Sequence, residues 1–397
     1  MRTKIYKATA VLSAALILAG CSNAGSGAGE APSEGPIKIA LVTSLTGAYS
    51  PLGEGNLQGA QIAVDEVNAA GGIKGRQVEL VVKDDKTVAD QSVINVNDAI
   101  GDDSVLAILG SPDSNSAVAA APIAARAQVP YLSQSSNDTL TAKVDPYIFN
   151  SPPNTAAWAE KVFLYMKDNK MTKIALAYAE DDVFAVGGHK SSLELAKEHG
   201  IDIVVDEAFK TADTEFSGLL QKVRDTAPQA FLFWGTGAAP VIVTKAFADS
   251  GIDSQLIFTG AQASTLYSNA VGKAGDGVIL DGYTSVIGEY LPEGEQKNEY
   301  KKLKTALEAK NLGPVSQFNS DSYSATTLII EALKSSEELT REGVRDALEK
   351  TDRITINGTY KWSPTDHNNS DLDNVAVFEV KDSNFIPAEW QMARMKG

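Results

Sequence analysis

The chain has 397 residues, of which 43% are hydrophobic and 22% are charged, and its formal net charge at pH 7 is −16. This composition is typical of a globular protein, and the length exceeds that of one ordinary domain, so we expect two lobes. The acidic balance argues against binding to nucleic-acid phosphates or to anionic lipid headgroups through the folded body.

The N-terminal residues have the pattern of a secretory signal. Three basic residues within the first seven positions precede a short apolar segment that ends at residues 18–21 (LAGC). This segment is too short to span a bilayer as a helix. Residues 18–21 resemble a bacterial lipobox, which implies that Cys21 is lipidated and becomes the first residue of the mature protein. The alternative is an ordinary cleaved signal with a chance cysteine.

We therefore predict a lipoprotein signal peptide over residues 1–20, whose removal would change the formal charge from −16 to −19. Residues 22–36 (SNAGSGAGEAPSEGP) contain no large apolar residue. Such a segment cannot bury a core, so we predict a flexible linker over 21–36 between the lipid and the domain. Cys21 is the only cysteine, which rules out an intrachain disulfide.

From residue 37 onward, short β-branched runs alternate with longer segments of helical period. The first series of predicted buried strands covers 37–43, 78–82, 105–109 and 129–133. The second series covers 173–179, 201–209, 229–235 and 254–260, separated by predicted helices near 155–168, 184–198, 213–224 and 239–249. Alternating strands and helices indicate two α/β lobes, each a mainly parallel sheet flanked by helices.

After residue 282 the pattern changes. We predict helices near 297–309, 319–335 and 340–350, followed by strands near 354–361 and 374–380. This tail has little core of its own, so it must complete one or both sheets.

The opening of the predicted domain carries a specific signature. A first strand leads to a loop with residues 45–47 (LTG), then to a helix that ends at 71–73 (GGI), and then to a second strand that ends at 84–85 (DD). This stretch resembles the branched-chain amino acid type of periplasmic binding protein, the receptor of an ABC importer. The resemblance covers most of the exported part and weakens over the last eighty residues.

The resemblance implies two lobes of type I periplasmic binding topology, joined by three crossings and closing on a small ligand. We expect an N-terminal lobe and a C-terminal lobe with these bounds: 37–150 with 283–360, and 151–282 with 361–397. It further implies a non-enzymatic, extracytoplasmic receptor, a monomer without cofactor, metal or nucleic acid. Its partners would be a small amino acid or carboxylate, an ABC permease and, through the lipid anchor only, the cell membrane.

The resemblance also assigns ligand-binding positions. Ser114 lies at the start of a predicted helix and matches the family serine that holds the ligand carboxylate, while Ser135 and Asn137 match positions that grip the same group. A helix N-terminus offers unpaired N–H groups and a partial positive charge, so it accepts an anion without a basic side chain. The alternative for these three residues is plain capping and turn chemistry.

On the second lobe, Phe184 falls where many relatives have a tyrosine that covers the ligand side chain. On the first lobe, Leu52 occupies a position that is aromatic in some relatives. Thr236 lies in the loop after a predicted strand on the far side of the cleft. A core role is the alternative for Phe184.

Gln262 is the largest departure from the family pattern, because amino-acid binders have an acidic residue there that pairs with the ligand ammonium. An amide accepts a weaker hydrogen bond than a carboxylate would. Asp181 or Asp182 could supply the missing charge. Otherwise the ligand is an aromatic or aliphatic acid, or an amide, without an α-amino group.

Other classes of protein fit less well. Gly53, Gly55 and Gly59 followed by acidic residues at 84–85 imitate a dinucleotide fingerprint, but about nine residues separate the first strand from Gly53, which is too long for a phosphate turn. The three histidines show no metal-ligand spacing, and no nucleophile elbow is present, so we predict neither a metal site nor catalytic residues.

Overall fold

The computed structural model describes residues 35–369 and 371–396. The predicted signal peptide, the predicted lipidation site Cys21 and the predicted linker up to residue 34 lie outside the described residues, so these predictions are not tested. Within the described ranges, no helix combines the length and the apolar character that a membrane crossing requires.

The first sheet has five parallel strands in the order β2-β1-β3-β4-β5. Their bounds are β1 (Ile37–Thr43), β2 (Val78–Asp84), β3 (Val105–Leu109), β4 (Tyr131–Ser133) and β5 (Ile148–Asn150). Successive side chains of a strand point to opposite faces. In β1, Ile39 and Leu41 accordingly belong to one core, while Ala40 and Val42 belong to another.

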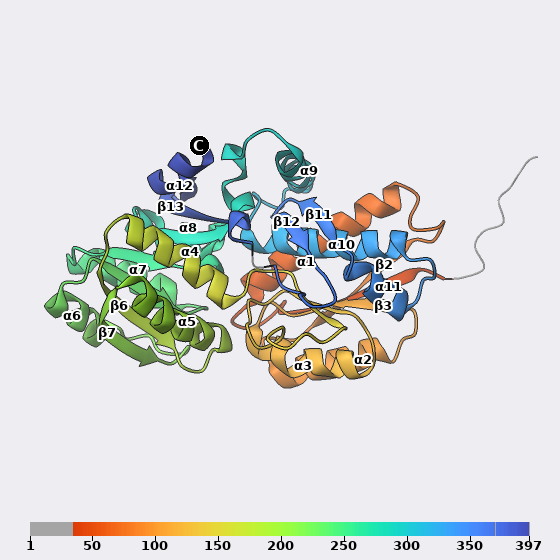
Figure 1. Ribbon diagram of the computed structural model, residues 1–397, viewed down its shortest axis with the longest axis horizontal. Coiled ribbons are helices and arrows are strands. Elements are labelled where there is room, and N and C mark those ends of the chain that lie inside the picture. The colour runs from red at the N-terminus through yellow and green to blue at the C-terminus, as the bar shows by residue number, and fades with distance from the viewer. Residues whose placement is uncertain (1–34, 370, 397) are drawn as a thin grey trace, which may run out of the picture. The chain divides into compact units, whose positions relative to one another are not determined.

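Helices cover both faces of this sheet (Figure 1). The face of Ala40 and Val42 packs against α2 (Ala89–Ile100) and α3 (Ser114–Arg126). The other face packs against helices that come from two distant parts of the chain, together with a two-stranded hairpin. These elements are α1 (Ser50–Ala69), α9 (Glu295–Lys310), α10 (Gln317–Ser335), α11 (Arg341–Leu348), β11 (Asp352–Thr355) and β12 (Gly358–Lys361).

The second sheet has seven strands in the order β14-β13-β10-β9-β8-β6-β7. Their bounds are β6 (Lys173–Ala179), β7 (Asp202–Phe209), β8 (Ala230–Trp234), β9 (Gln255–Phe258), β10 (Ile279–Tyr283), β13 (Val375–Lys381) and β14 (Asn384–Pro387). The strands from β6 to β10 are parallel, whereas β13 is antiparallel to β10 and β14 is antiparallel to β13. The tail of the chain thus completes this second sheet.

The helices that accompany the second sheet are α4 (Thr155–Asp168), α5 (Val183–His199), α6 (Ser217–Thr226), α7 (Ala239–Ser250), α8 (Thr265–Val271) and α12 (Glu389–Lys396). Four short 3-10 helices, η1 (Gly260–Gln262), η2 (Gly272–Gly275), η3 (Thr284–Tyr290) and η4 (Leu372–Asn374), lie in the connections. We call the first sheet with its helices the first lobe and the second sheet with its helices the second lobe. The chain runs between the two sheets after β5, after β10 and between β12 and β13; the boundaries predicted from the sequence stay a prediction.

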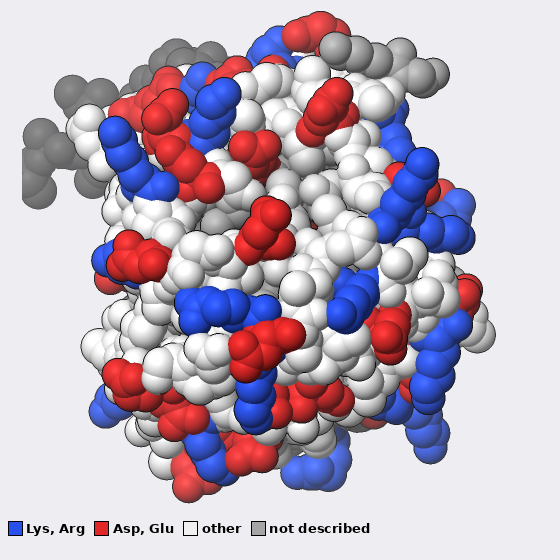
Figure 2. Space-filling view, turned by 90° about the vertical axis from the view of Figure 1, so that its left-hand side faces the viewer, with Lys and Arg blue, Asp and Glu red and all other residues white. Residues whose placement is uncertain are grey.

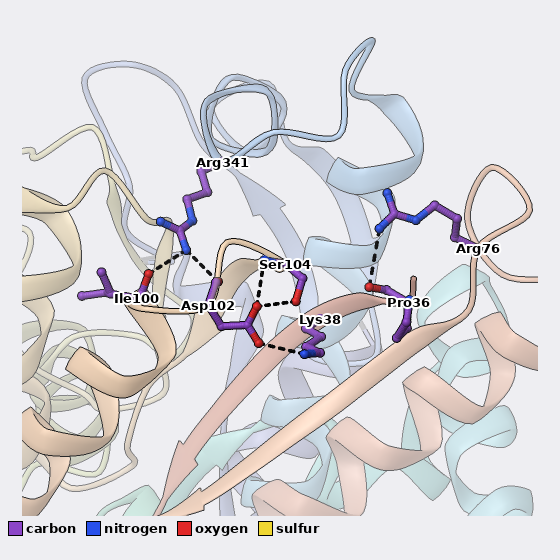
Figure 3. Close-up of polar contacts among 7 residues, drawn as sticks. All are labelled: Pro36, Lys38, Arg76, Ile100, Asp102, Ser104 and Arg341. Atoms are coloured by element: carbon purple, nitrogen blue, oxygen red, sulfur yellow. Dashed lines mark hydrogen bonds and ion pairs between the residues drawn. The ribbon is translucent and has the colours of Figure 1, made fainter. Parts of the chain in front are cut away.

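Polar contacts tie the edge of the first lobe together (Figure 3). Lys38 of β1 forms an ion pair with Asp102 at 2.8 Å, and the Asp102 carboxylate also accepts a hydrogen bond from the Ser104 N–H. Arg341 of α11 donates from Nη2 to the carbonyls of Ile100 and Asp102, at 3.0 and 2.9 Å. These bonds hold α11 against the turn between α2 and β3.

Charges of both signs are interspersed on the side of the second lobe formed by α6 and β7 (Figure 2). The exposed ion pairs of this lobe include Lys222 with Glu207 at 2.6 Å and Lys210 with Glu180 at 2.8 Å. Solvent-exposed pairs of this kind contribute about 0–1 kcal/mol each. The net negative charge is therefore not gathered into one acidic surface on this side.

The glycines of α1 that imitate a nucleotide fingerprint have a packing role. A Cβ built on Gly55 would lie 2.8 Å from Cβ of Phe318, and one on Gly59 would overlap the carbonyl oxygen of Asn319. Both clashes involve the start of α10. These glycines allow α1 and α10 to approach closely and do not form a phosphate-binding turn.

We predict that Gly59→Ala lowers the free energy of unfolding by about 1–3 kcal/mol, because α10 must shift to admit the methyl group. Gly218→Ala is the control: Gly218 lies in α6, and a Cβ there meets nothing within 4 Å. That substitution should raise stability by roughly 0.5–1 kcal/mol through helix propensity. Urea unfolding of both variants measures the two effects, and equal changes would contradict the packing role.

Candidate ligand-binding site between the lobes

A cavity lies between the lobes, at the carboxyl ends of the parallel strands. The first lobe contributes side chains from the segments that follow β1, β3 and β4, and the second lobe contributes side chains from the segments that follow β6, β8 and β9. Helices α4 and α10 close the remaining sides. Parallel α/β sheets bind ligands at this end, because the loops there are free of sheet pairing and helix N-termini point toward it. The side chains used below are Tyr49, Leu52, Ser114, Gln134, Ser136, Trp158, Asp182, Phe184, Thr236, Tyr283, Phe318 and Asp321.

The free space inside this cavity is about 50 Å³. A single buried water needs about 10–15 Å³ of such space. The cavity therefore admits groups larger than one water, bounded by aromatic side chains and a few polar ones, as in many small-molecule sites.

Four of the residues predicted from the sequence line the cavity. Leu52 and Ser114 come from the first lobe, and Phe184 and Thr236 come from the second. Phe184 is 8% exposed and packs edge to face on Trp234, with ring centroids 5.3 Å apart. Trp234 itself is fully buried and does not line the cavity. Phe184 thus joins the core on one side and faces the cavity on the other.

The other three predicted residues lie outside the lining. The Ser135 hydroxyl pairs with the Ser133 hydroxyl at 3.0 Å, and Asn137 Oδ1 accepts the Thr139 N–H at 2.7 Å. Gln262 donates from Nε2 to the carbonyl of Gly235 at 2.9 Å. It lines a neighbouring cavity that shares Leu52 and Thr236 with the first one. These three residues support the walls in this structure.

Several lining residues were not selected from the sequence. Gln134 and Ser136 alternate along the loop with the predicted residues Ser135 and Asn137, so the loop presents the opposite set of side chains to the cavity. Tyr49 lies in the loop after β1. Because Leu52 occupies a position that is aromatic in some relatives, the nearby aromatic residue Tyr49 could have been selected from the sequence. Asp321 lies on α10, and only tertiary packing brings it to the cavity.

Polar contacts between the lobes close one side of the cavity. The Tyr49 hydroxyl, from the first lobe, donates to Asp182 Oδ2 at 3.1 Å and is also bonded to the Thr236 hydroxyl. Thr236 donates to the same Asp182 oxygen at 2.8 Å. Nearby, Asn115 Oδ1 accepts the N–H of Val183 at 3.1 Å. The structure therefore holds the two lobes together around the cavity.

A further contact crosses the cavity wall at Trp158 of α4. Its indole N–H donates to the Ser136 hydroxyl at 2.7 Å, and its ring meets Tyr283 edge to face at 5.8 Å between centroids. Ser114 stands beside this contact at the first position of α3, and its hydroxyl donates to the Ser136 carbonyl at 3.4 Å. The helix N-terminus is capped by Asp113, which accepts the N–H groups of Asn115 and Ser116.

Two carboxyl groups, Asp182 and Asp321, line the cavity, and none of the described lining residues is Lys, Arg or His. Burial raises the pKa of Asp182 above its ordinary value, although hydrogen bonds from Thr236 and Tyr49 act against the shift. Burial raises the pKa of Asp321 to about 7, against hydrogen bonds from Ser151 and Tyr283. Desolvation disfavours the charged form of an acid, and no nearby cation offsets it here.

Two α/β lobes that enclose a cavity at the carboxyl ends of both sheets define a type I periplasmic binding fold. A family model described as periplasmic binding protein matches residues 36–384, and the chain belongs to that family. Its relatives and structural neighbours are substrate-binding proteins and not enzymes.

Relatives of known name are distant in sequence. The leucine-, isoleucine-, valine-, threonine-, and alanine-binding protein of Pseudomonas aeruginosa is 24% identical over 314 residues, which is 79% of this chain and 82% of that protein. Leu/Ile/Val-binding protein homolog 7 of Brucella abortus is 24% identical over 349 residues, which is 82% of this chain and 84% of that protein.

Solved structures agree on the fold. An extracellular ligand-binding receptor from Rhodopseudomonas palustris HaA2 matches with a TM-score of 0.82 and 21% identity, over 89% of this chain and 100% of that one. The branched-chain amino acid transporter substrate binding protein LivJ from Streptococcus pneumoniae, in complex with isoleucine, matches with a TM-score of 0.78 and 24% identity, over 89% and 99%.

Asp321 should make stability depend on pH in a way that can be isolated by mutation. Its pKa rises from 3.8 in the unfolded chain to about 7 in the native protein, so the native state binds more protons between these values. The stabilising contribution of Asp321 to the free energy of unfolding is therefore at its maximum below pH 4. It falls by up to about 1.4 kcal/mol per pH unit as the pH rises toward 7.

Asp321→Asn removes this titration. The free energy of unfolding of the variant, minus that of the native sequence, should increase from pH 4 to pH 7 and then level off. Denaturant unfolding at a series of pH values measures the difference, and a difference that does not vary with pH would contradict the assignment.

Proposed function

We propose that this protein is the substrate-binding lipoprotein of an ABC importer and captures a branched-chain or related small amino acid outside the cytoplasmic membrane. The observation that carries the proposal is the cavity at the strand ends of both lobes, sealed by contacts such as Tyr49 to Asp182. Membership of the periplasmic binding protein family supports it, and so do relatives named for leucine, isoleucine and valine binding.

The lining suits a ligand with a charged head and an apolar side chain. Ser114 at the first position of α3 favours a carboxylate through its hydroxyl and its own N–H, since Asp113 already accepts the N–H groups of Asn115 and Ser116. The described lining has two carboxyl groups and no basic side chain, so its electrostatic balance favours a positively charged nitrogen. Leu52 and Phe184 offer an apolar surface to a hydrocarbon side chain. These features together favour a zwitterion over a plain carboxylate.

Capture proceeds by closure of the two lobes. The head group docks on the first lobe at Ser114, and the second lobe then brings Phe184 and Thr236 against the ligand and expels water. A ligand favours the closed state only through contacts that are better in that state. The permease would recognise the closed arrangement, and lipidation of Cys21 would keep the receptor at the membrane.

The second candidate ligand is an acid or amide without an α-amino group. The observation in its favour is the neutral Gln262, whose amide N–H already binds the Gly235 carbonyl. This candidate retains the carboxylate site at Ser114 and needs no partner for an ammonium group.

A thermal-shift screen of the protein tests the proposal. Binding to the native state raises the melting temperature by an amount that grows with the ligand concentration relative to the dissociation constant. We predict a concentration-dependent rise with at least one of leucine, isoleucine, valine, alanine or threonine. A screen in which none of these, and no small aliphatic or aromatic acid or amide, shifts the melting temperature would contradict the proposed function.

Ser114→Ala should reduce that shift, with a loss of about 1–3 kcal/mol in binding free energy, because a polar ligand group is left unpaired. Ser217→Ala is the matched control, since Ser217 is also the first residue of a helix but is exposed and remote from the cavity lining. Calorimetry with the ligand found in the screen compares the two variants, and equal affinities would remove Ser114 from the site.

A further inference from the structure

The two carboxyl groups of the cavity wall differ in how many of their oxygen atoms are occupied. Asp182 Oδ2 accepts hydrogen bonds from Tyr49 and Thr236, and Asp182 Oδ1 accepts the N–H of Phe184 at 2.9 Å. Both oxygens of Asp182 are therefore used inside the protein. Asp182 joins the lobes and has little capacity left for a ligand.

Asp321 has one carboxyl oxygen that accepts no hydrogen bond from the described residues. Oδ1 accepts the hydroxyls of Ser151 and Tyr283, both at 2.7 Å, and no hydrogen bond reaches Oδ2 from the described part of the chain. The side chain lines the cavity and its residue is only 3% exposed. Ser151 and Tyr283 belong to the segments where the chain leaves β5 and β10, so they hold Asp321 in the cavity wall near two crossings between the lobes.

No described basic side chain forms an ion pair with Asp321. A buried carboxyl group without a counter-charge is costly, so proteins seldom keep one without a partner. The raised pKa of Asp321 reports this cost, and a cationic group that enters the cavity would lower it again.

Gln134 gives independent evidence that a hydrogen-bond partner is missing from the same cavity. It is 5% exposed, lines the cavity, and neither its amide nitrogen nor its amide oxygen has a hydrogen-bond partner in the described structure. Buried side-chain amides are ordinarily paired. Gln134 follows β4 in the first lobe, whereas Asp321 belongs to α10, so the two unsatisfied groups approach the cavity from different elements.

We propose that Asp321 binds the ammonium group of an amino-acid ligand through Oδ2, and that the Gln134 amide donates to the carboxylate of the same ligand. This inference rests on the proposed function and specifies its substrate class: the ligand carries a protonated amine. Asp321 of α10 then supplies the charge that Gln262 lacks, whereas Gln262 lines the neighbouring cavity.

The test pairs each amino acid with the same molecule without its amine: L-leucine with 4-methylpentanoate, L-isoleucine with 3-methylpentanoate and L-valine with 3-methylbutanoate. Calorimetry with the full protein at pH 7.5 should give binding of at least one amino acid and at least tenfold weaker binding of its acid. Asp321→Asn should weaken binding of the amino acid by about ten- to a hundredfold, the usual range for a lost charge-assisted hydrogen bond. It should not weaken binding of the acid, which has no ammonium group and is repelled by the ionised Asp321 at this pH.

Asp181→Asn is the matched control, because Asp181 neighbours the cavity residue Asp182 but instead binds Thr211 at an exposed position. It should leave every affinity unchanged. Asn has the shape of Asp and removes a buried charge, so Asp321→Asn is expected to fold, which its melting temperature verifies.

The pH dependence of binding gives a second readout, in which the native protein is compared with Asp321→Asn. Affinity for the amino acid should rise from pH 5.5 to pH 7.5, as Asp321 ionises, while affinity for the acid should not. Asp182 also lines the cavity and burial also raises its pKa, so the rise is assigned to Asp321 only if Asp321→Asn abolishes it. The tyrosines nearest to Asp321 are Tyr283 and Tyr360, and the pKa of each is raised above its ordinary value by burial. Neither tyrosine changes its charge in this range.

The outcomes separate the inference from the proposed function. Equal affinity of Asp321→Asn and the native sequence for the amino acid overturns the inference and leaves the proposed function standing. Tighter binding of the acid than of the amino acid, or affinity for the amino acid that does not change with pH, also overturns it. Absence of binding by every probe overturns both.

Discussion

The constraint on which the site depends is the burial of polar groups between two lobes that meet at the carboxyl ends of their sheets. Groups sealed in such a place must find partners in the protein or in a ligand. Asp182 accepts hydrogen bonds from Tyr49 and Thr236, and the bond from Tyr49 joins the two lobes. Asp321 and Gln134 retain atoms without partners. The cavity wall therefore contains both a hydrogen bond that holds the lobes together and polar groups that remain available to a ligand.

The fold produces this arrangement from simple elements. Parallel strands bring their carboxyl ends to one edge of each sheet, and the loops that follow β3, β4, β6 and β8 all begin at that edge. The close approach of α1 and α10, which Gly55 and Gly59 permit, carries Asp321 to the same place. A helix that belongs to the first lobe but comes late in the chain thereby forms part of the site.

Much of the architecture could be predicted from the sequence, because buried parallel strands are continuous β-branched runs. The predicted bounds 37–43 and 105–109 coincide with β1 and β3, and the helix near 155–168 coincides with α4. The prediction did not include β5 and β14, which have three and four residues, or β10, which contains Gly282. Such short strands are defined by their neighbours in the sheet and have no pattern of their own.

The site was less accessible to sequence reasoning. A resemblance can indicate a loop, but which side of that loop faces the ligand depends on its backbone path, and here Gln134 and Ser136 line the cavity while Ser135 and Asn137 do not. Position 262 illustrates the same difficulty, since the Gln262 amide binds a backbone carbonyl. Asp321 has no local signal at all, because its surroundings are assembled from residues far away in the chain.

If both lobes hold one small solute at their strand ends, hydrogen exchange should detect the contact on each lobe. With and without the amino acid that binds, exchange followed by mass spectrometry reports the protection of each loop. We expect slower exchange in the loops near residues 110–116 and 133–137 of the first lobe and, together with them, near 180–184 and 234–238 of the second. Protection confined to one lobe, or found only away from these loops, would contradict binding by both lobes.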